Sequence, residues 1–509
     1  MNDRLIVRLL CSTLRIVAVL MLPALLVSLG YDEMGAALSF GVTIGLMLLL
    51  SLVSFLYRPF KTTLYAREGF VLVAVAWIIL SMLGALPFLI SGAIPNYVDC
   101  LFETVSGFTT TGASILSDVE SLPRGIIYWR SFTHWLGGMG VLVFMLAISS
   151  FAGRSGDGMF IMRAESPGPQ VSKLVPRTAQ TARILYSLYI ALTCIQVVFL
   201  LAGGMPLFDA VTTAFGTAGT GGFGIRNDSM MSYSPYLQNV VTVFMLLFGV
   251  NFGIYYLLIR RSFREALREE ELRMYLIMIL AATGVITAAT LRFYTGGHAL
   301  ADALRHAAFQ VVSITTTTGF CSIDYESWPQ ICHTVLLTLM IVGACAGSTG
   351  GGAKCSRVII LLRSLKVEIQ KLLHPGMVRP VTLNKKTVPE ETVRGVYAFY
   401  GMYALIAVGS LLLVSLDGFD LETNLSAMLS CLNNIGPGFR LVGPTGNFGS
   451  FSPLVKLVLT LDMLIGRLEI FPIVLLCLPQ VWRRDHTLRR AVPGAACCRA
   501  GHANSEPID

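Results

Sequence analysis

The sequence predicts an all-α protein that crosses a membrane many times. Only 13% of its 509 residues are charged, 54% are hydrophobic, and the mean hydropathy is +0.69. About 25% of the residues of an ordinary soluble chain are charged, so this chain has too few charges to cover a surface that faces water. Soluble enzymes and binding modules are therefore disfavoured, and the lipid bilayer is the first expected partner.

Ten segments are long and apolar enough to span a bilayer, which requires about 20 predominantly apolar residues. They are 9–30, 36–57, 69–92, 132–152, 184–204, 237–259, 274–294, 333–362, 395–416 and 453–482. A second apolar run follows the first at once, and no small-residue cleavage motif stands out between them. We therefore expect the first segment to be a transmembrane helix and not a signal peptide.

Four shorter, semi-apolar stretches lie between these segments, and each ends in a turn that contains glycine. The turns are "SGFTTTGAS" (106–114), "FGTAGTGGFGI" (215–225), "SITTTTGFCS" (313–322) and "CLNNIGPGF" (431–439). Asp99 and Asp209 each lie 13 residues before a glycine, Gly112 and Gly222, so the first two stretches share a register. Stretches this short do not span a bilayer and are often re-entrant.

This pattern predicts four pseudo-repeats of helix, pore half-helix, filter loop and helix around a central pore, with two extra helices before them. The expected divisions are residues 1–65 for the two extra N-terminal helices, 66–178, 179–268, 269–390 and 391–485 for repeats 1 to 4, and 486–509 for a basic and polar C-terminal tail. The third repeat is expected to contain a broken helix.

The distribution of basic residues predicts the orientation. If both termini are cytoplasmic, that side holds the clusters 154–183, 260–273, 354–394 and 483–499 as well as Arg4, Arg8, Arg15, Arg58, Lys61 and Arg67. The other side holds Arg124, Arg130, Arg226, Arg292, Arg305 and Arg440. The positive-inside rule favours this topology, which places the glycine turns outside. Basic residues in clusters next to a membrane do not indicate nucleic-acid binding.

Two glycine-rich stretches resemble nucleotide-binding motifs. Residues 219–224, "GTGGFG", fit G-x-G-x-x-G, but that fingerprint requires a strand before it and a βαβ unit around it. Residues 347–354, "GSTGGGAK", miss the P-loop pattern because Ala353 separates the last glycine from the lysine. We therefore expect no nucleotide to bind to this chain itself.

The four turns have the composition of a cation filter. Exposed backbone is costly in lipid unless it lines a water-filled path or is buried in protein. Rings of backbone carbonyls can replace the hydration shell of a cation, as in the potassium-channel filter. Glycine permits the unusual dihedral angles that turn carbonyls toward one axis, and the C-terminal ends of the half-helices favour a cation. Close helix packing by glycine would explain one such turn more easily than four.

At these residues the chain resembles the Trk/Ktr/HKT superfamily of potassium transporters, and most closely the bacterial Trk membrane subunits. The motifs are "TVSGFTTTGAS", "HWLGGMG" (134–140), "TTTTGF", "NNIGPGF", "GACAGSTGGGAK" (343–354) and "GRLEIFP" (466–472). The resemblance covers about residues 5–485 and implies potassium uptake across the bacterial inner membrane. It further implies a homodimer and a separate cytosolic TrkA-type regulatory subunit that binds a nucleotide, NAD or ATP.

The resemblance also implies the site residues. The filter glycines are Gly112, Gly222, Gly319 and Gly436. The carbonyl donors to potassium are the two residues before each glycine: Thr110, Thr111, Thr220, Gly221, Thr317, Thr318, Asn434 and Ile435. The second loop contains several glycines, so its register is open by a residue or two.

A gate is expected below the filter. Five glycines interrupt a predicted helix, where each costs about 1 kcal/mol: Gly343, Gly347, Gly350, Gly351 and Gly352. The resemblance implies a flexible plug; a kinked packing site is the alternative. Arg467 falls within the last apolar segment, where a charge is expensive, and either borders the plug or pairs with a carboxylate on another helix. His134 is expected to be a hydrogen-bonded packing residue rather than a proton relay.

The sequence thus predicts a gated potassium-uptake pore and no enzyme. A symporter that couples potassium to protons or sodium is the alternative, which sequence cannot separate. A membrane-embedded enzyme would require converging acid, base or metal-ligand residues, and no HExxH motif, paired intramembrane carboxylates or nucleophile constellation is found. A receptor without transport activity is a further class.

Overall fold

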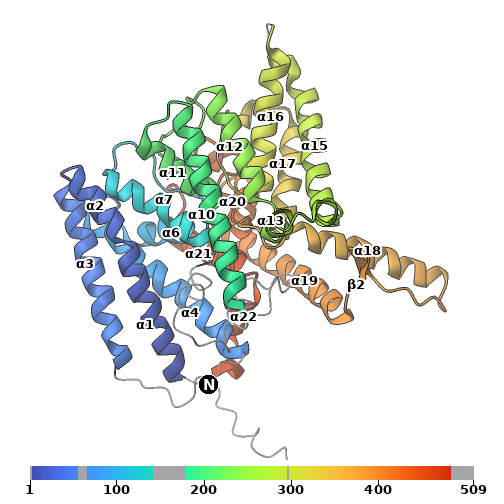
Figure 1. Ribbon diagram of the computed structural model, residues 1–509, viewed down its shortest axis with the longest axis horizontal. Coiled ribbons are helices and arrows are strands. Elements are labelled where there is room, and N and C mark those ends of the chain that lie inside the picture. The colour runs from blue at the N-terminus through green and yellow to red at the C-terminus, as the bar shows by residue number, and fades with distance from the viewer. Residues whose placement is uncertain (1–2, 56–65, 141–177, 295–296, 483–509) are drawn as a thin grey trace, which may run out of the picture.

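Helices make up nearly all of the regular structure (Figure 1). The computed structural model describes residues 3–55, 66–140, 178–294 and 297–482. Within these ranges the strands are β1 (Thr382–Leu383) and β2 (Lys386–Thr387), which pair antiparallel as a short hairpin. The predicted all-α fold class is confirmed, with this hairpin as an addition.

Six helical stretches of the described chain are long and apolar enough to cross a membrane. They are built from α1 (Asp3–Leu20) and α2 (Leu22–Gly30), α3 (Met34–Ser51) and η1 (Leu52–Phe55), α4 (Ala66–Gly84) and α5 (Leu86–Ile90), α10 (Thr178–Ala202), α15 (Glu270–Thr290) and η3 (Leu291–Phe293), and α19 (Glu390–Val414) and η5 (Ser415–Asp417). The breaks after α1 and α4 each fall two residues before a proline, Pro23 or Pro87, which has no backbone N–H to donate.

The other four predicted spans are not continuous helices in the described chain, and a break was expected only in segment 333–362. Three of them are each divided into two helices. Segment 237–259 forms α12 (Pro235–Phe248) and α13 (Phe252–Ile259), segment 333–362 forms α17 (Gln330–Val342) and α18 (Cys355–Leu373), and segment 453–482 forms α21 (Pro453–Arg467) and α22 (Phe471–Cys477). The fourth, α7 (Arg124–Gly138), ends early, and the rest of segment 132–152 lies outside the described residues. Helices α12 and α13 meet at 90°. Most of these breaks could not be predicted from hydropathy, because the residues on both sides of each break are apolar.

Four short helices lie between the long ones: α6 (Tyr97–Phe108), α11 (Leu207–Ala218), α16 (Ala299–Thr315) and α20 (Leu421–Leu432). Asn96 and Asp420 cap α6 and α20 by accepting a backbone N–H in the first turn. Each short helix packs against the helix that follows it and against the corresponding helix of the preceding unit. The pairs are α6 with α7 and α21, α11 with α12 and α7, α16 with α17 and α12, and α20 with α21 and α17. This order closes a ring.

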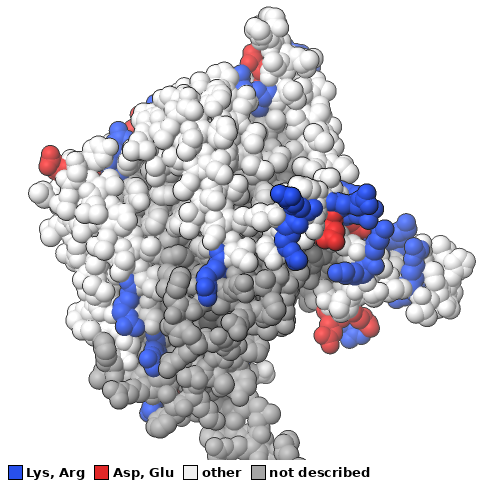
Figure 2. Space-filling model, viewed as in Figure 1, with Lys and Arg blue, Asp and Glu red and all other residues white. Residues whose placement is uncertain are grey.

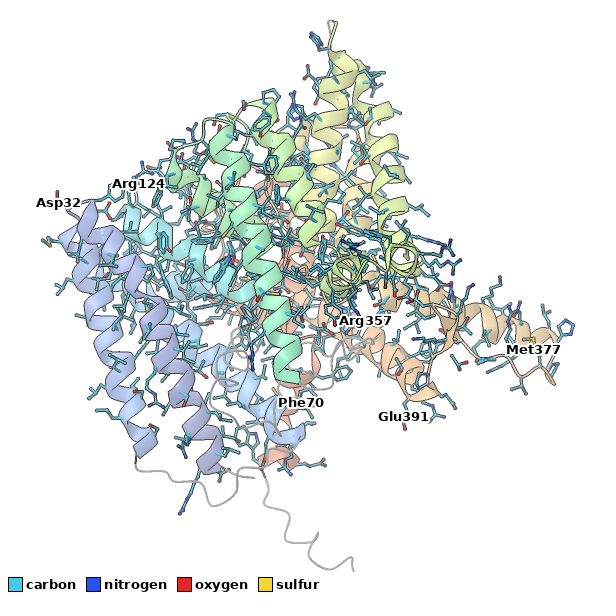
Figure 3. All side chains as sticks on the ribbon, in the orientation of Figure 1. Asp32, Phe70, Arg124, Arg357, Met377 and Glu391 are labelled. Atoms are coloured by element: carbon cyan, nitrogen blue, oxygen red, sulfur yellow. The ribbon has the colours of Figure 1, made fainter. Side chains whose placement is uncertain are left out.

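Helices α1 to α3 form one edge of the molecule and pack against α7 and α4 (Figure 1). Glu33, at the turn before α3, accepts hydrogen bonds from the backbone N–H groups of Arg124 (2.7 Å) and Gly125 (3.0 Å) at the first turn of α7. Figure 3 shows Asp32 of this turn near Arg124. A carboxylate is favourable at a helix N-terminus, so this contact attaches the extra helices to the ring.

Charged side chains gather in one region of the visible face, where α18 leaves the bundle (Figure 2). Arg357 lies at the inner end of this arm and Met377 at its far end (Figure 3). The remaining short elements are α14 (Phe263–Ala266), η4 (Tyr325–Ser327), η6 (Arg440–Val442) and α23 (Pro479–Trp482).

Candidate functional site

All four short helices end in a loop of the same conformation. The first residue of each loop core has a left-handed φ: 55° at Thr110, 54° at Thr220, 57° at Thr317 and 57° at Asn434. Two residues later comes a glycine with positive φ: 80° at Gly112, 74° at Gly222, 83° at Gly319 and 106° at Gly436. The matching conformation in the second loop falls on Thr220, Gly221 and Gly222, which is the register chosen from the sequence.

Backbone hydrogen bonds repeat in the same way. The residue between the two left-handed positions donates its N–H to the carbonyl five residues earlier in the short helix. These bonds are Thr111 to Ser106 (2.9 Å), Gly221 to Gly216 (2.8 Å), Thr318 to Ser313 (2.8 Å) and Ile435 to Ser430 (2.9 Å). In a trans peptide the C=O and N–H point in opposite directions, so the carbonyl of the residue before each of these donors faces away from the helix.

The carbonyls of the two residues before each filter glycine are buried and lack a donor among the described residues. The carbonyl oxygens of the eight predicted filter residues accept no hydrogen bond from any described part of the chain. Thr110 and Thr317 are 1% exposed, and Thr111, Thr220, Thr318, Asn434 and Ile435 are 0% exposed. More than 90% of buried backbone carbonyls in proteins are paired. Eight unpaired carbonyls in equivalent positions therefore indicate a site built to bind something with them.

The four loops touch one another in a closed ring. A Cβ on Gly112 would overlap the carbonyl oxygen of Gly221. Equivalent overlaps would join Gly222 to Thr318, Gly319 to Ile435, and Gly436 back to Thr111. The chain visits the loops in the order in which they neighbour each other, and the last contacts the first. Glycine is required at these positions by both its φ and its neighbour.

A cavity of ≈ 120 Å³ opens on one side of the ring, and the four filter glycines line it together with the segments that follow the loops. Asn227 crosses from the second of these segments to the first, donating from Nδ2 to Asp118 (2.9 Å) and accepting from the Val119 N–H (2.8 Å). The hydrogen bond from Asn227 holds the pKa of Asp118 below its usual range, so this exposed carboxylate stays ionised near the mouth of the cavity.

A buried ion pair braces the first two loops from behind. Arg130 on α7 donates from Nε to Glu103 (2.7 Å) and from Nη1 to the Gly224 carbonyl (2.9 Å). Its guanidinium also lies 3.5 Å from the centre of the Phe223 ring. Glu103 in turn accepts from the Ile115 N–H at 3.0 Å. The sequence pattern did not reveal this pair, because 27 residues separate its members.

His134 connects the first short helix to the second loop. Its Nδ1 lies 2.9 Å from the Gly107 carbonyl, and its Nε2 lies 3.3 Å from the Phe223 backbone nitrogen. A carbonyl only accepts, so Nδ1 carries the proton and Nε2 accepts from Phe223. A Cβ on Gly219 or Gly221 would overlap His134. Gly219 and Gly221 of "GTGGFG" therefore make room for this histidine, which has the packing role expected from the sequence.

The glycine run that follows α17 lies against the opposite side of the ring. The Gly351 N–H donates to the Thr317 hydroxyl at 2.6 Å, and a Cβ on Gly351 would overlap the Asn433 carbonyl. Gly343 and Gly352 have φ values of 74° and 77° and pack on each other, so the two ends of the loop meet. The structure thus brings the predicted plug segment next to the predicted filter.

Two cations contact this loop. Arg467 donates from Nη1 to the Thr349 carbonyl (3.0 Å) and the Thr110 hydroxyl (3.3 Å), and from Nη2 to the carbonyls of Gly137 and Gly138 (the latter at 2.8 Å). Lys354, which sequence reasoning missed, donates to the Gly350 carbonyl at 2.5 Å. A lysine next to a glycine run in an apolar segment was the signal that could have found it.

The other charges of these spans pair across long sequence distances. Glu469 contacts Arg357 on α18, and Arg357 also lies 4.1 Å from the Phe399 ring centre. Lys456 donates to Asp99 at 2.7 Å. Asp462, which is six residues from Lys456 in the chain, accepts instead from Ser410.

The fold defines the class of this chain: a multi-pass helical membrane protein with four short helices whose C-terminal loops converge. The model of the TrkH family, described as cation transport proteins, matches residues 38–483. The chain belongs to the TrkH family of cation transport proteins.

Individual relatives agree with this assignment. The Trk system potassium uptake protein TrkH of Salmonella typhimurium is 38% identical over 431 residues, which cover 84% of this chain and 88% of that protein. The protein of the same name from Halomonas elongata is 35% identical and covers 95% of this chain and 100% of its own. The crystal structure of the potassium transporter TrkH from Vibrio parahaemolyticus matches with a TM-score of 0.84 and 33% identity over 95% of this chain and 100% of that chain.

We predict that His134→Phe lowers the free energy of unfolding. The phenyl ring fills the same space but leaves the buried Phe223 N–H unpaired, which costs about 1–3 kcal/mol. It also removes one bond to the Gly107 carbonyl, which still accepts from the Thr110 N–H (3.1 Å). His134→Gln, which can place an amide oxygen near Phe223, should lose less. Thermal unfolding of the detergent-solubilised protein measures both variants. Equal unfolding temperatures for wild type and His134→Phe would show that these two hydrogen bonds do not stabilise the loop.

Proposed function

We propose that this chain takes up potassium through a pore whose filter is the ring of four loops. The carbonyls of Thr110, Thr111, Thr220, Gly221, Thr317, Thr318, Asn434 and Ile435 are the proposed ligands. The observation that carries the proposal is that these eight buried oxygens lack a donor in the described part of the chain and belong to one closed ring. The proteins of similar sequence that bear the name potassium uptake protein support the choice of ion.

The chemistry of the ring suits a dehydrated monovalent cation. Carbonyl oxygens replace the water molecules that the ion loses, without adding a full negative charge that would hold the ion too tightly. The short helices α6, α11, α16 and α20 all end at the ring, so the partial negative charges of their C-termini add to the attraction. The carboxylate of Glu103 behind the ring is paired with Arg130, which leaves the carbonyls as the ligands.

The same geometry supports a gate on the other side of the ring. The loop 343–354 lies across the inner face, and Arg467 holds it by donating to Thr349 while also contacting Thr110 of the filter. A fixed positive charge below the filter opposes a passing cation, and low local polarity strengthens this effect. Opening therefore requires the loop and Arg467 to move apart.

The membrane setting and partners are part of this proposal. The basic clusters favour a topology with both termini in the cytoplasm and the ≈ 120 Å³ cavity outside. Residues 66–178, 179–268, 269–390 and 391–485 are the four repeats, and 1–65 and 486–509 flank them. We further propose that the chain forms a homodimer in the bacterial inner membrane, where a cytosolic TrkA-type subunit that binds NAD or ATP regulates it.

Complementation tests the function directly. Expression of this chain should restore growth at low potassium to a bacterium that lacks its own potassium-uptake systems. Reversal potentials in proteoliposomes under varied proton and sodium gradients then separate a pore from a symporter. A folded, inserted protein that neither restores growth nor carries potassium would refute the proposal and favour a receptor.

We predict that Gly112→Ser lowers the discrimination between potassium and sodium. A side chain there would collide with the Gly221 carbonyl, and the left-handed φ of 80° disfavours a Cβ by about 1–2 kcal/mol. Gly92→Ser is the matched control, because Gly92 has a φ of 74° but no neighbouring atom within 4 Å of the place where a Cβ would stand. Permeability ratios are measured in proteoliposomes. Equal ratios in both variants and wild type would remove Gly112 from the filter.

We predict that Arg467→Ala conducts more than the wild type. The substitution removes both the charge below the filter and the bonds that hold the loop. Arg467→Lys retains the charge but not the forked donors of the guanidinium. A higher flux in Arg467→Ala alone therefore indicates that the charge closes the gate. A higher flux in both variants indicates that the hydrogen bonds close it. The control is Arg394→Ala, whose side chain is 77% exposed and pairs with Glu390. Loss of membrane insertion with no flux increase would instead assign Arg467 a structural role.

A further inference from the structure

Three consecutive glutamates at the start of α15 connect the glycine loop to the β hairpin. Glu271 is 4% exposed and faces the loop 343–354. Glu269 and Glu270 face Asn384, in the turn between β1 and β2. The proposed filter and gate use none of these three carboxylates.

Glu271 holds both sides of the glycine loop with one oxygen. Its Oε1 accepts from the Ala346 N–H at 2.7 Å and from the Ser356 N–H at 2.9 Å. These two residues stand on either side of the stretch 347–355, which includes the segment bonded to Thr317 and Arg467. Hydrogen bonds to an ionised acceptor are about twice as strong as neutral ones. A single carboxylate therefore fixes the separation of the two ends of this stretch.

Glu269 and Glu270 bind the hairpin turn. Asn384 donates its backbone N–H to Glu270 (3.0 Å) and its side-chain amide to Glu269 (2.5 Å), and its Oδ1 accepts from the Glu270 N–H (2.9 Å). Arg363 on α18 bridges Glu270 (2.7 Å) and the Thr382 carbonyl (2.6 Å). Asn384 and Lys385 have φ values of 53° and 62°, which form the tight turn that presents these groups.

The hairpin is accessible while Glu271 is not. Lys385, Lys386 and Thr387 are exposed, and the hairpin lies beside α18 outside the main bundle (Figure 1). Glu269 to Glu271 are adjacent in the chain, so any displacement of Asn384 acts directly on the first turn of α15. A shift of that turn moves the Glu271 carboxylate relative to Ala346 and Ser356.

We propose that Glu271 is a positioning residue that holds the glycine loop in its closed place, and that the hairpin 382–387 is the lever through which a cytosolic contact releases it. This inference rests on the proposed gated pore and names the residues that regulate it. It predicts that breaking either contact raises the basal flux and leaves ion selectivity unchanged, because the filter carbonyls are untouched.

The test uses the full chain in proteoliposomes, with rubidium flux normalised to inserted protein and no regulatory subunit present. Glu271→Ala should raise basal flux by roughly tenfold, the change that a shift of about 1.4 kcal/mol in a closed–open equilibrium produces. Glu271→Gln retains an amide oxygen that can accept from both N–H groups, so its flux should return toward the wild-type value. The ratio of potassium to sodium permeability should be equal in all three proteins.

A second pair of variants leaves the buried carboxylate in place. Asn384→Gly keeps the left-handed turn but removes the side-chain bonds to α15, so it should also raise basal flux. Lys385→Gly changes the neighbouring exposed residue, whose side chain makes no hydrogen bond or ion pair with the described part of the chain, and should leave flux unchanged. If Glu271→Ala does not insert, the Asn384 pair decides the question alone.

The outcomes separate the two proposals. If the wild-type protein carries rubidium and both Glu271→Ala and Asn384→Gly have the same flux as the wild type, the proposed role of Glu271 and the hairpin is wrong. The proposed pore is unaffected by that result. Equal leaks in Asn384→Gly and Lys385→Gly would also overturn the proposed lever, since the turn and not the Asn384 contact would then be responsible. No flux in any protein, wild type included, would overturn the proposed function and this inference with it.

Discussion

The structure depends on one steric constraint: each filter glycine packs against the carbonyl oxygen of the next loop around the ring. No side chain fits at Gly112, Gly222, Gly319 or Gly436, and each of these glycines also has a positive φ. Four such contacts position the four loops with respect to one another. They are packing contacts and not hydrogen bonds, so the carbonyls before each glycine still accept no hydrogen bond from the described part of the chain. Close packing thus holds the four loops together and leaves these oxygens without a donor.

The surrounding charges follow from this requirement. Arg130 with Glu103, Lys456 with Asp99 and Arg357 with Glu469 are pairs in which each charge satisfies the other. Unpaired ions in such a setting would be costly and would compete with the carbonyls for a cation. Arg467 and Lys354 differ because they donate to backbone carbonyls of the glycine loop. Those contacts concentrate positive charge on one side of the ring, which is why we assign the gate to that side.

Sequence reasoning succeeded where the signal was local. Composition predicted the membrane fold. Gly222, which precedes Phe223 as Gly319 precedes Phe320, was chosen for the second loop, and this register has the conformation of the other three loops. It failed where partners lie far apart in the chain or where apolar residues continue through a break. Segment 237–259 was expected to be one helix but turns by 90°, and Glu469 and Arg357, 112 residues apart, carried no mutual signal. The ion-binding role of the eight carbonyls remains a prediction.

Anomalous scattering from crystals grown with rubidium tests the central claim most directly, because rubidium substitutes for potassium and is visible apart from water. The account predicts anomalous density on the axis of the ring, between the carbonyls of the residues that precede Gly112, Gly222, Gly319 and Gly436. Density at these positions should disappear when sodium replaces rubidium. A protein that transports rubidium in proteoliposomes but shows no rubidium at the ring, or shows it bound elsewhere, would contradict the assignment.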